Sequence, residues 1–190
     1  TIAYPQNLET KYFLKKFKTK KINYIGNLKF AESSEENFKL MNKKLKLKLN
    51  KSKIWVASST HKNEEIFCAK AHIELSKKVK NLITIIIPRH VHRVNEIAQE
   101  LKNNDLKVAC HSSNFKNLKN IDIYIVDTFG ETKLFHQISS TVFLGGSIIK
   151  RGGQNPLEAA RLGSKILHGP NTDNFRDVYK HLKLLNISKK

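Results

Sequence analysis

The sequence predicts an α/β domain built on a doubly wound parallel sheet, on two observations. Short apolar runs rich in β-branched residues alternate along the chain with segments of helical pattern. Several runs are apolar on both faces, as in LITIIIP at 82–88, which is typical of parallel strands covered by helices on both sides. With 190 residues, 39% of them hydrophobic, the chain is long enough for one domain with a buried core.

Each element is assigned in chain order from its side chains, strands where β-branched and apolar residues cluster and helices in the intervening patterns. The expected strands are INYIGN (22–27), KIWVASS (53–59), LITIIIP (82–88), LKVAC (106–110), IDIYIVD (121–127), TVFLGG (141–146) and KILHG (165–169). The expected helices lie near 7–18, 34–47, 62–79, 91–104, 131–139, 156–162 and 173–185. The lysine-rich tract at 43–53 is interpreted as a solvated helix end.

Cysteine use and hydropathy exclude several classes of protein. Cys68 and Cys110 lie in apolar or strand-like runs without a CxxC or Cys/His cluster, which favours a reducing compartment and neither a zinc site nor a disulfide framework. No apolar run reaches the roughly 20 residues of a membrane span. The first residues contain neither a signal-peptide core nor a starting methionine, so we expect the chain to be part of a longer protein.

The formal charge of +19 indicates an acidic partner such as nucleic acid, an anionic membrane or a phosphorylated substrate. However, the chain has 30 lysines and only 5 arginines, and phosphate-binding sites favour the planar fork of arginine. We therefore interpret most lysines as a bias of composition. Four of the five arginines lie in or beside candidate site loops: Arg89, Arg93, Arg151 and Arg176.

The loops that follow the expected strands carry the polar residues. Ligands of doubly wound sheets bind outside the carboxyl ends of the strands. The loops there, at 58–65, 88–93, 127–131 and 145–158, contain Ser, Thr, His, Arg, Asp, Glu and Gly, whereas loops of the opposite edge are plain lysine and asparagine. This asymmetry predicts a binding site at the carboxyl edge.

The segment RGGQNPLE, residues 151–158, has the features of an anion site. Gly152 and Gly153 permit positive φ and close approach of a ligand to the backbone. Asn155 is expected to cap a helix whose first residue is Pro156, and the free N–H groups of a helix start favour phosphate. Glu158 would then accept hydrogen bonds from sugar hydroxyls. The alternative is a well-capped helix in which Glu158 only complements the helix dipole.

Three other loops add candidate ligand contacts. The backbone amides of Phe129, Gly130 and Glu131 could hold a base edge or a phosphate, although an ordinary βα turn capped by an Asp or Thr would look the same. Arg89 follows a proline at a strand end, where its guanidinium suits bidentate phosphate binding. His90 and His92 lack the acidic partner of a metal site and are interpreted as polar loop residues or ligand contacts.

The SSTH segment offers Ser59, Thr60 and His61 for phosphate or carboxylate binding, which we favour over a Ser–His nucleophile because no GxSxG elbow is present. Together the loops predict an anionic, nucleotide-like ligand. A P-loop NTPase is disfavoured because GxxxxGK[ST] is absent, and a dinucleotide oxidoreductase because no GxGxxG follows a first strand.

Seven short sequence motifs occur in a defined order and spacing along the chain. They are GNLKF (26–30), ASSTH (57–61) followed by EE (64–65), PRH (88–90), DTFGE (127–131), FLGGS (143–147), RGGQNPLE (151–158) and GPNTDNF (169–175). Together they resemble the C-terminal half of the 3-deoxy-D-manno-octulosonic acid (Kdo) transferases of lipopolysaccharide biosynthesis. Each word alone is unspecific, but the set covers residues from about 26 to 176.

The resemblance implies a GT-B glycosyltransferase with two facing Rossmann-like domains, of which residues 1–190 are the donor-nucleotide-binding one. It implies that 1–21 are a linker or helix from the missing N-terminal domain and that the C-terminal helices are truncated. The implied donor is CMP-Kdo and the implied acceptor a lipid A precursor, without cofactor or metal. The family's catalytic base is a glutamate of the missing domain, so we expect this chain to be inactive alone. We also expect this chain to be soluble. The whole enzyme is expected to lie on the anionic cytoplasmic face of the bacterial inner membrane as a peripheral protein.

The resemblance also implies roles for particular residues. CMP contacts are carried over to Pro88, Arg89, Phe129, Gly130, Glu131, Asn155, Pro156, Leu157 and Glu158, and stabilisation of the transition state to Lys29. Further candidate contacts are Ser59, Thr60, His61, Gly146, Ser147, Arg151, Gly152 and Gly153. The alternatives are a GT-B domain for another nucleotide sugar and a basic nucleic-acid-binding module. The second is disfavoured because only 8% of residues are aromatic and no RNP or helix-turn-helix word occurs.

Overall fold

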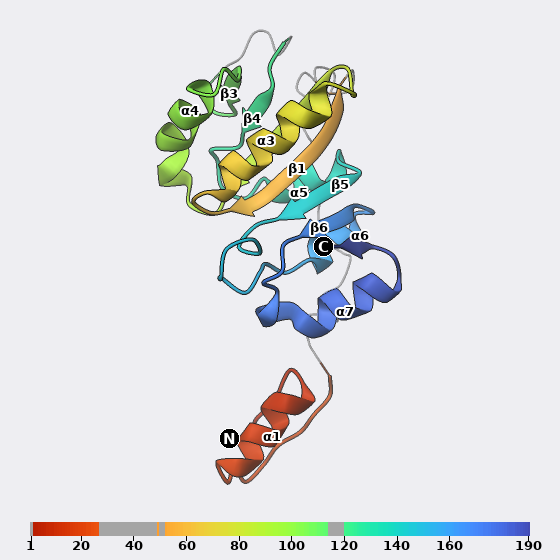
Figure 1. Ribbon diagram of the computed structural model, residues 1–190. Coiled ribbons are helices and arrows are strands. Elements are labelled where there is room, and N and C mark those ends of the chain that lie inside the picture. The colour runs from red at the N-terminus through yellow and green to blue at the C-terminus, as the bar shows by residue number, and fades with distance from the viewer. Residues whose placement is uncertain (1, 27–48, 50–51, 114–119) are drawn as a thin grey trace. The chain divides into compact units, whose positions relative to one another are not determined.

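The computed structural model describes residues 2–26, 49, 52–113 and 120–190 (Figure 1). The chain divides into two compact units, Thr1–Asn37 and Phe38–Lys190, and each is described by itself. The expected helix near 34–47 and Lys29 lie outside the described residues.

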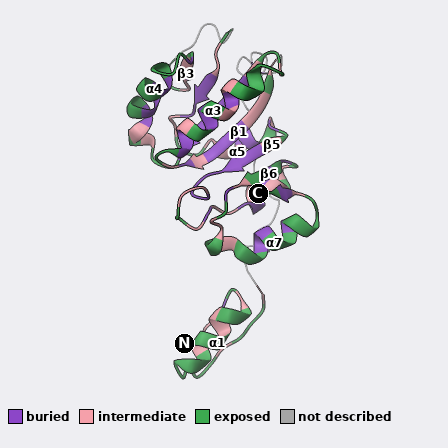
Figure 2. Ribbon diagram, viewed as in Figure 1, coloured by how far each residue is buried: buried purple, intermediate pink, exposed green. Residues whose placement is uncertain are grey.

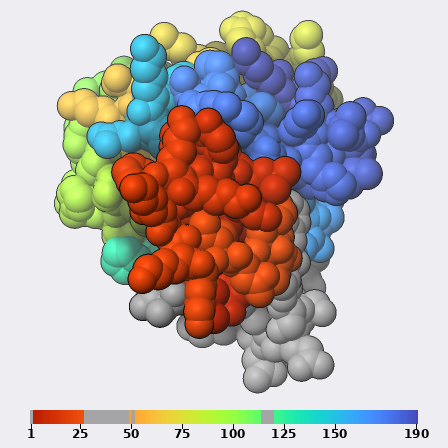
Figure 3. Space-filling model, turned by 90° about the horizontal axis from the view of Figure 1, so that it is seen from below, coloured from red at the N-terminus to blue at the C-terminus, as the bar shows by residue number. Residues whose placement is uncertain are grey.

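The N-terminal unit contains one described helix, α1 (Leu8–Lys16), which begins after Asn7. The Asn7 side chain accepts a hydrogen bond from the Thr10 N–H at 2.8 Å, and no residue of α1 is buried. The described residues of this unit are red to orange in Figure 3. The strand expected at 22–27 is wrong for its described part, since Ile22 makes only an isolated bridge to Ala3. Among the described residues of this unit no second strand lies beside the run, so the run forms no ladder there.

The larger unit is built on a seven-stranded sheet in which every strand pair is parallel. Its strands are β1 (Lys53–Thr60), β2 (Leu82–Pro88), β3 (Val108–Cys110), β4 (Ile123–Ile125), β5 (Thr141–Leu144), β6 (Lys165–His168) and β7 (Ser188–Lys189). The spatial order is β3-β4-β2-β1-β5-β6-β7. The predicted parallel sheet is therefore confirmed, and β7 is an edge strand that the sequence pattern did not indicate.

Helices cover both faces of this sheet. They are α3 (Glu64–Ser76), α4 (Val94–Lys102), α5 (Thr132–Gln137), α6 (Leu157–Arg161) and α7 (Arg176–Leu184), with short 3-10 helices before α4 and α7 at Val91–Arg93 and Asp173–Phe175. Successive strand residues enter opposite cores: Val56 packs with the α5–α7 side and Ala57 with the α3–α4 side. Strands β2 and β4 are accordingly almost entirely buried and β1 is buried in its middle, whereas no residue of α1 is buried (Figure 2).

The direction in which successive strands are added to the sheet reverses at β1, because β1 pairs with β2 on one side and with β5 on the other. The chain therefore leaves the carboxyl ends of β1 and β5 toward different faces, which is the switch point where doubly wound sheets hold their ligands. The end of β1 is irregular there. Its register with β2 shifts between Ser58 and Thr60, and Ser59 has a positive φ of 56°.

Candidate functional site

The sequence-predicted contacts follow the carboxyl ends of four strands that lie side by side in the order β4-β2-β1-β5. Phe129–Glu131 follow β4, Arg89 follows β2, Ser59–His61 end β1, and the segment 145–158 follows β5. Parallel strands carry all four loops to one edge of the sheet.

The ends of β1 and β2 are joined by their backbones. The Arg89 N–H donates to the Thr60 carbonyl at 2.9 Å, while the Arg89 side chain is exposed. Three imidazoles lie beside this junction. The rings of His61 and His90 are 5.8 Å apart and those of His90 and His92 are 5.6 Å apart. The loop thus gathers one exposed guanidinium and three aromatic rings that can donate or accept hydrogen bonds.

His61 is held in one orientation by its own strand end. Its Nδ1 lies 3.1 Å from the Ser59 carbonyl, which can only accept, so Nδ1 carries the proton and Nε2 is left as an acceptor. Burial lowers the pKa of His61, and the charges of Arg151 and Arg89 lower it further, against the raising effects of Glu64 and the Ser59 carbonyl. The ring is therefore neutral at neutral pH.

Two of the arginines singled out in the sequence belong to ion pairs. Arg93 Nη1 lies 3.0 Å from Glu65 Oε1, and both side chains are almost wholly buried. Arg176 Nη2 lies 2.7 Å from Asp173 Oδ1 on the surface. Arg93 therefore anchors α4 to α3. The exposed Arg89 is better placed than Arg93 to meet a ligand.

The loop after β4 presents an aromatic ring. The Phe129 side chain is 82% exposed and precedes Gly130, whose φ of +78° turns the chain into α5. The carboxylate of Glu131 faces inward, where Oε2 accepts from the Thr128 hydroxyl and lies 3.1 Å from His111 Nε2. Ligand contacts of Gly130 and Glu131 would therefore come from their backbones, beside an exposed ring suited to stacking.

The glycines of the β5–α6 loop serve the packing of the chain itself. Gly152 and Gly153 have φ of +80° and +75°, as the sequence predicted. However, a Cβ on Gly152 would lie 2.5 Å from the Asn174 side chain, and one on Gly153 would lie 3.1 Å from the Asn171 carbonyl. The space beside both residues is filled by the segment after β6, so they do not open the backbone to a ligand on that side.

The start of α6 lies one residue later than predicted. Pro156 occupies the cap position and Leu157 is the first helical residue. Asn155 still makes the capping contact, because its Oδ1 accepts the Leu157 N–H at 3.1 Å. The preceding backbone is tied down as well, since the Tyr179 hydroxyl donates to the Gln154 carbonyl at 3.0 Å.

Glu158 lies half-exposed in the first turn of α6, beside His136 and Lys133 of α5. Its Oε1 is 3.5 Å from Nδ1 of the buried His136 and its Oε2 is 4.0 Å from Lys133 Nζ. His136 is the largest influence that lowers the pKa of Glu158, against the effect of burial. Glu158 is thus an ionised acceptor, suited to the two hydroxyls of a ribose. Sequence reasoning missed His136, which lies in an otherwise ordinary amphipathic helix.

Other kinds of site find no support within the parts of the chain that the structure describes. There, no group of three His, Cys, Asp or Glu side chains is arranged to hold a metal ion. In the same residues no helix is both long and apolar enough to span a membrane.

Comparisons with known proteins point in one direction. No family model matches the sequence. The chain is 32% identical over 183 residues to the 3-deoxy-D-manno-octulosonic acid transferase of Haemophilus influenzae, an alignment covering 95% of this chain and 43% of that protein. It is 34% identical over 156 residues to the enzyme of the same name from Rickettsia conorii, covering 82% of this chain and 33% of that protein. The chain thus spans less than half the length of these relatives.

A solved structure resembles the fold. The C-terminal CMP-Kdo binding domain of WaaA from Acinetobacter baumannii superimposes with a TM-score of 0.66 and 27% sequence identity. The match covers 73% of this chain and 74% of that domain.

Proposed function

Because the chain belongs to the 3-deoxy-D-manno-octulosonic acid (Kdo) transferase family, we propose that its larger unit binds CMP-Kdo as the donor domain of a glycosyltransferase. The whole enzyme would transfer Kdo to a lipid A precursor and release CMP. The observation that carries the proposal is the meeting of Arg89, Phe129 and the Asn155–Glu158 turn at one edge of a sheet similar to a known CMP-Kdo binding domain.

Each part of the donor has a chemically suited partner at this edge. Glu158, whose pKa His136 lowers below its ordinary value, accepts hydrogen bonds from the ribose hydroxyls. The exposed Arg89 guanidinium binds the phosphate, and its planar fork suits two phosphate oxygens. The cytosine lies against the exposed Phe129 ring, with the neighbouring backbone amides meeting its polar edge.

The chemistry is a displacement in which this chain supplies position and charge. A base outside this chain takes the proton of the acceptor hydroxyl, the oxygen forms a bond to the anomeric carbon of Kdo, and the bond from that carbon to the phosphate oxygen breaks. The departing CMP gains negative charge, which Arg89 and the N–H groups at the start of α6 stabilise. The resemblance assigns a similar role to Lys29, which stays a prediction because Lys29 lies outside the described residues.

Titration calorimetry of the 190-residue chain with CMP tests the proposal. We expect Arg89→Ala and Glu158→Ala each to weaken CMP binding about tenfold or more, since each removes a charge-assisted hydrogen bond. Lys80→Ala and Glu100→Ala, exposed charges away from the carboxyl-edge loops, are matched controls that should bind CMP as the unmodified chain does.

Two outcomes of this titration would overturn the proposal. A chain that ignores CMP does not contain the donor site. A chain that prefers UDP to CMP belongs to a transferase for another nucleotide sugar. Binding to nucleic acid with a steep dependence on salt, without binding to CMP, would instead favour the nucleic-acid alternative.

We also propose that the protein works at the anionic cytoplasmic face of the bacterial inner membrane as a peripheral protein, because the proposed acceptor is a membrane lipid. The surface of α1 supports this. Apolar side chains that are 48% to 80% exposed stand there among lysines, and Lys16 Nζ lies 4.7 Å from the centroid of the Tyr12 ring. These exposed apolar side chains are Leu8, Tyr12, Phe13 and Phe17. Aromatic and cationic side chains together are typical of segments that lie in a membrane interface.

A further inference from the structure

We propose that Glu64 is a positioning residue of the donor site. Its buried carboxylate, at the start of α3, holds the loop between β5 and α6 in place. This inference rests on the proposed function, because that loop carries the Asn155–Glu158 turn. Glu64 is the first residue of α3, and it is 82 to 84 residues away in sequence from its main partners.

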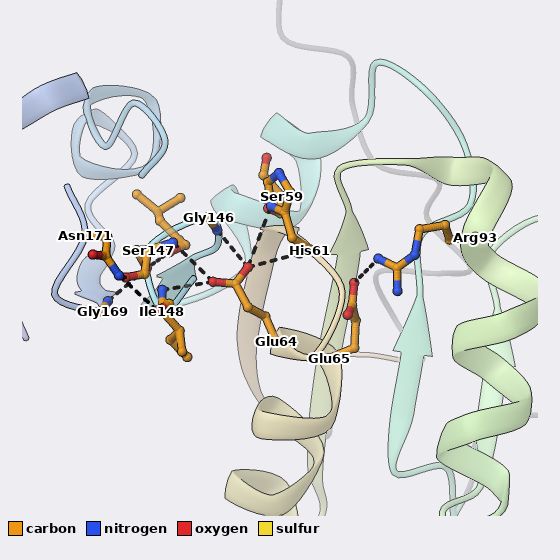
Figure 4. Close-up of polar contacts among 11 residues, drawn as sticks. Ser59, His61, Glu64, Glu65, Arg93, Gly146, Ser147, Ile148, Gly169 and Asn171 are labelled. Atoms are coloured by element: carbon orange, nitrogen blue, oxygen red, sulfur yellow. Dashed lines mark hydrogen bonds and ion pairs between the residues drawn. The ribbon is translucent and has the colours of Figure 1, made fainter. Parts of the chain in front are cut away.

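The carboxylate of Glu64 is saturated by four backbone N–H groups (Figure 4). Its Oε2 accepts from His61 at 3.0 Å and from Gly146 at 2.7 Å. Its Oε1 accepts from Ser147 at 3.1 Å and from Ile148 at 3.0 Å. The side chain is wholly buried, so these amides replace its hydration completely. Three consecutive amides pointing at one carboxylate form an anion nest that the protein fills with its own side chain.

The loop held by Glu64 is tied in turn to the segment after β6. The Ser147 hydroxyl accepts the Gly169 N–H at 2.8 Å. The side-chain NH₂ group of Asn171 donates to the carbonyls of Ser147 and Ile148 at 3.2 and 2.9 Å. The Gly153 N–H donates to the Gly146 carbonyl at 2.8 Å, which closes the loop on itself. Glu64 therefore anchors a network that runs from the start of α3 to the residues just before Asn155.

The place of Glu64 determines what the switch point can bind. The crevice between β1 and β5 is where a doubly wound sheet ordinarily offers backbone amides to a phosphate. Here those amides already hold a carboxylate, and a Cβ on Gly145 would lie only 2.8 Å from Glu64 Oε2. The crevice is therefore closed to the donor phosphate, which leaves the exposed Arg89 as its partner. Four N–H groups already occupy the acceptor positions of the Glu64 carboxylate, so no lone pair is left to take a proton from a substrate, and Glu64 is not a catalytic base.

The neighbouring Glu65 provides a matched control within the same buried turn. It also is 0% exposed, but it faces away from Glu64, toward Arg93 (Figure 4). Its Oε1 accepts from Arg93 at 3.0 Å, whereas its Oε2 has no hydrogen-bond partner. A glutamine at position 65 would keep an oxygen for Arg93. A glutamine at position 64 would turn an NH₂ group toward two N–H donors, whichever way its amide is flipped.

The test compares Glu64→Gln with Glu65→Gln in the 190-residue chain. We expect Glu64→Gln to raise the CMP dissociation constant about tenfold or more, and Glu65→Gln to change it by less than about twofold. Hydrogen exchange followed by NMR should show loss of protection at the amides of Gly146, Ser147 and Ile148 in the first variant only. Glu64→Asp, which keeps the charge and shortens its reach, provides a milder variant should Glu64→Gln fail to fold, with a smaller loss of affinity expected.

Chemical rescue separates a positioning carboxylate from a merely structural side chain. Glu64→Ala would leave the four amides facing an empty space that fits a small carboxylate. We expect acetate to restore CMP binding to this variant and acetamide, of the same shape but neutral, to leave it weak.

The outcomes distinguish this inference from the proposed function. An unmodified chain that does not bind CMP refutes the donor-site proposal. An unmodified chain that binds CMP, together with a folded Glu64→Gln or Glu64→Asp variant of equal affinity, refutes the role of Glu64 alone. Equal effects of acetate and acetamide on Glu64→Ala would refute it as well.

Discussion

The pKa of Glu158, a candidate ligand contact, is lowered chiefly by a neighbour that is almost wholly buried, His136. The His136 side chain is only 3% exposed, and its Nδ1 lies 3.5 Å from Glu158 Oε1. Both belong to short helices on the same face of the sheet, α5 and α6. An ionised Glu158 beside this ring is ready to accept hydroxyl groups without first losing a proton.

The lowered pKa of Glu158 predicts a specific dependence of stability on pH. A carboxyl whose folded pKa lies below its ordinary value of 4.5 adds stability above that value and loses it as the pH falls through the folded pKa. Between about pH 6 and 3, the melting temperature of the unmodified chain should therefore fall more than that of Glu158→Gln. Glu100→Gln, an exposed carboxylate on α4, is the control and should follow the unmodified chain. Identical acid profiles for the unmodified chain and Glu158→Gln would contradict the pairing with His136.

Contacts between residues far apart in the chain could not be predicted from the sequence. The patterns singled out Arg89, Phe129 and Glu158, and these lie at the expected edge. Arg93 was named only as one of four arginines in or beside candidate site loops, and it is paired with a buried glutamate. Glu64 and His136 were not singled out as ligand-site residues, because the contacts that give them their roles join residues 22 to 84 positions apart, which no local pattern reports.

At the scale of elements, the apolar runs predicted the strands well where those strands pack on both faces. The run at 82–88 became β2 with the expected bounds. The run at 22–27 is interrupted by asparagine and glycine, and in its described part it makes only an isolated bridge, beside a described helix that buries no residue. The two-residue β7 was missed because a pairing so short leaves no periodicity to detect.

The close approach of β5 to the end of β1 predicts the cost of a methyl group at Gly145. A Cβ there would lie 2.4 Å from the Ser59 carbonyl oxygen and 2.7 Å from the Thr60 Cα, and both are backbone atoms that cannot turn aside. Urea unfolding should show that Gly145→Ala lowers the free energy of unfolding by about 2–3 kcal/mol.

Gly163→Ala is the matched control for this clash. Gly163 has a φ of +86° but open space around the position of a Cβ, so its replacement introduces conformational strain alone. A smaller loss, of about 1–2 kcal/mol, is expected for it. If Gly145→Ala were the milder of the two, the tight contact between the strand ends would not be real.

At the scale of the whole molecule, the sequence predicted the fold class correctly and left the use of its charge open. Strands that are apolar on both faces leave few alternatives to a parallel sheet between helix layers. A formal charge of +19 is compatible with several kinds of partner, since anionic lipid, nucleic acid and phosphorylated substrates all attract lysine. Charge is a long-range property that does not specify which surface meets the partner.

Vesicle binding tests the proposed membrane surface. We expect the chain to bind vesicles more tightly as their content of anionic phospholipid rises, with about 1 kcal/mol from each lysine close to the surface. The triple variant Lys11→Gln, Lys15→Gln, Lys16→Gln should weaken this binding about tenfold or more. The triple variant Lys77→Gln, Lys78→Gln, Lys80→Gln carries the same loss of charge on the larger unit and should weaken it less. Binding that ignores the anionic lipid content would contradict the proposal.

The outer strands of the sheet have a consequence for how copies of the molecule meet. The strands at its two borders, β3 and β7, contain only three and two residues. Such short borders offer few unpaired backbone groups to a strand from another copy. The seven-stranded sheet is in this way protected against growing from one molecule into the next, a safeguard against aggregation for a domain whose central strands are among its most apolar segments.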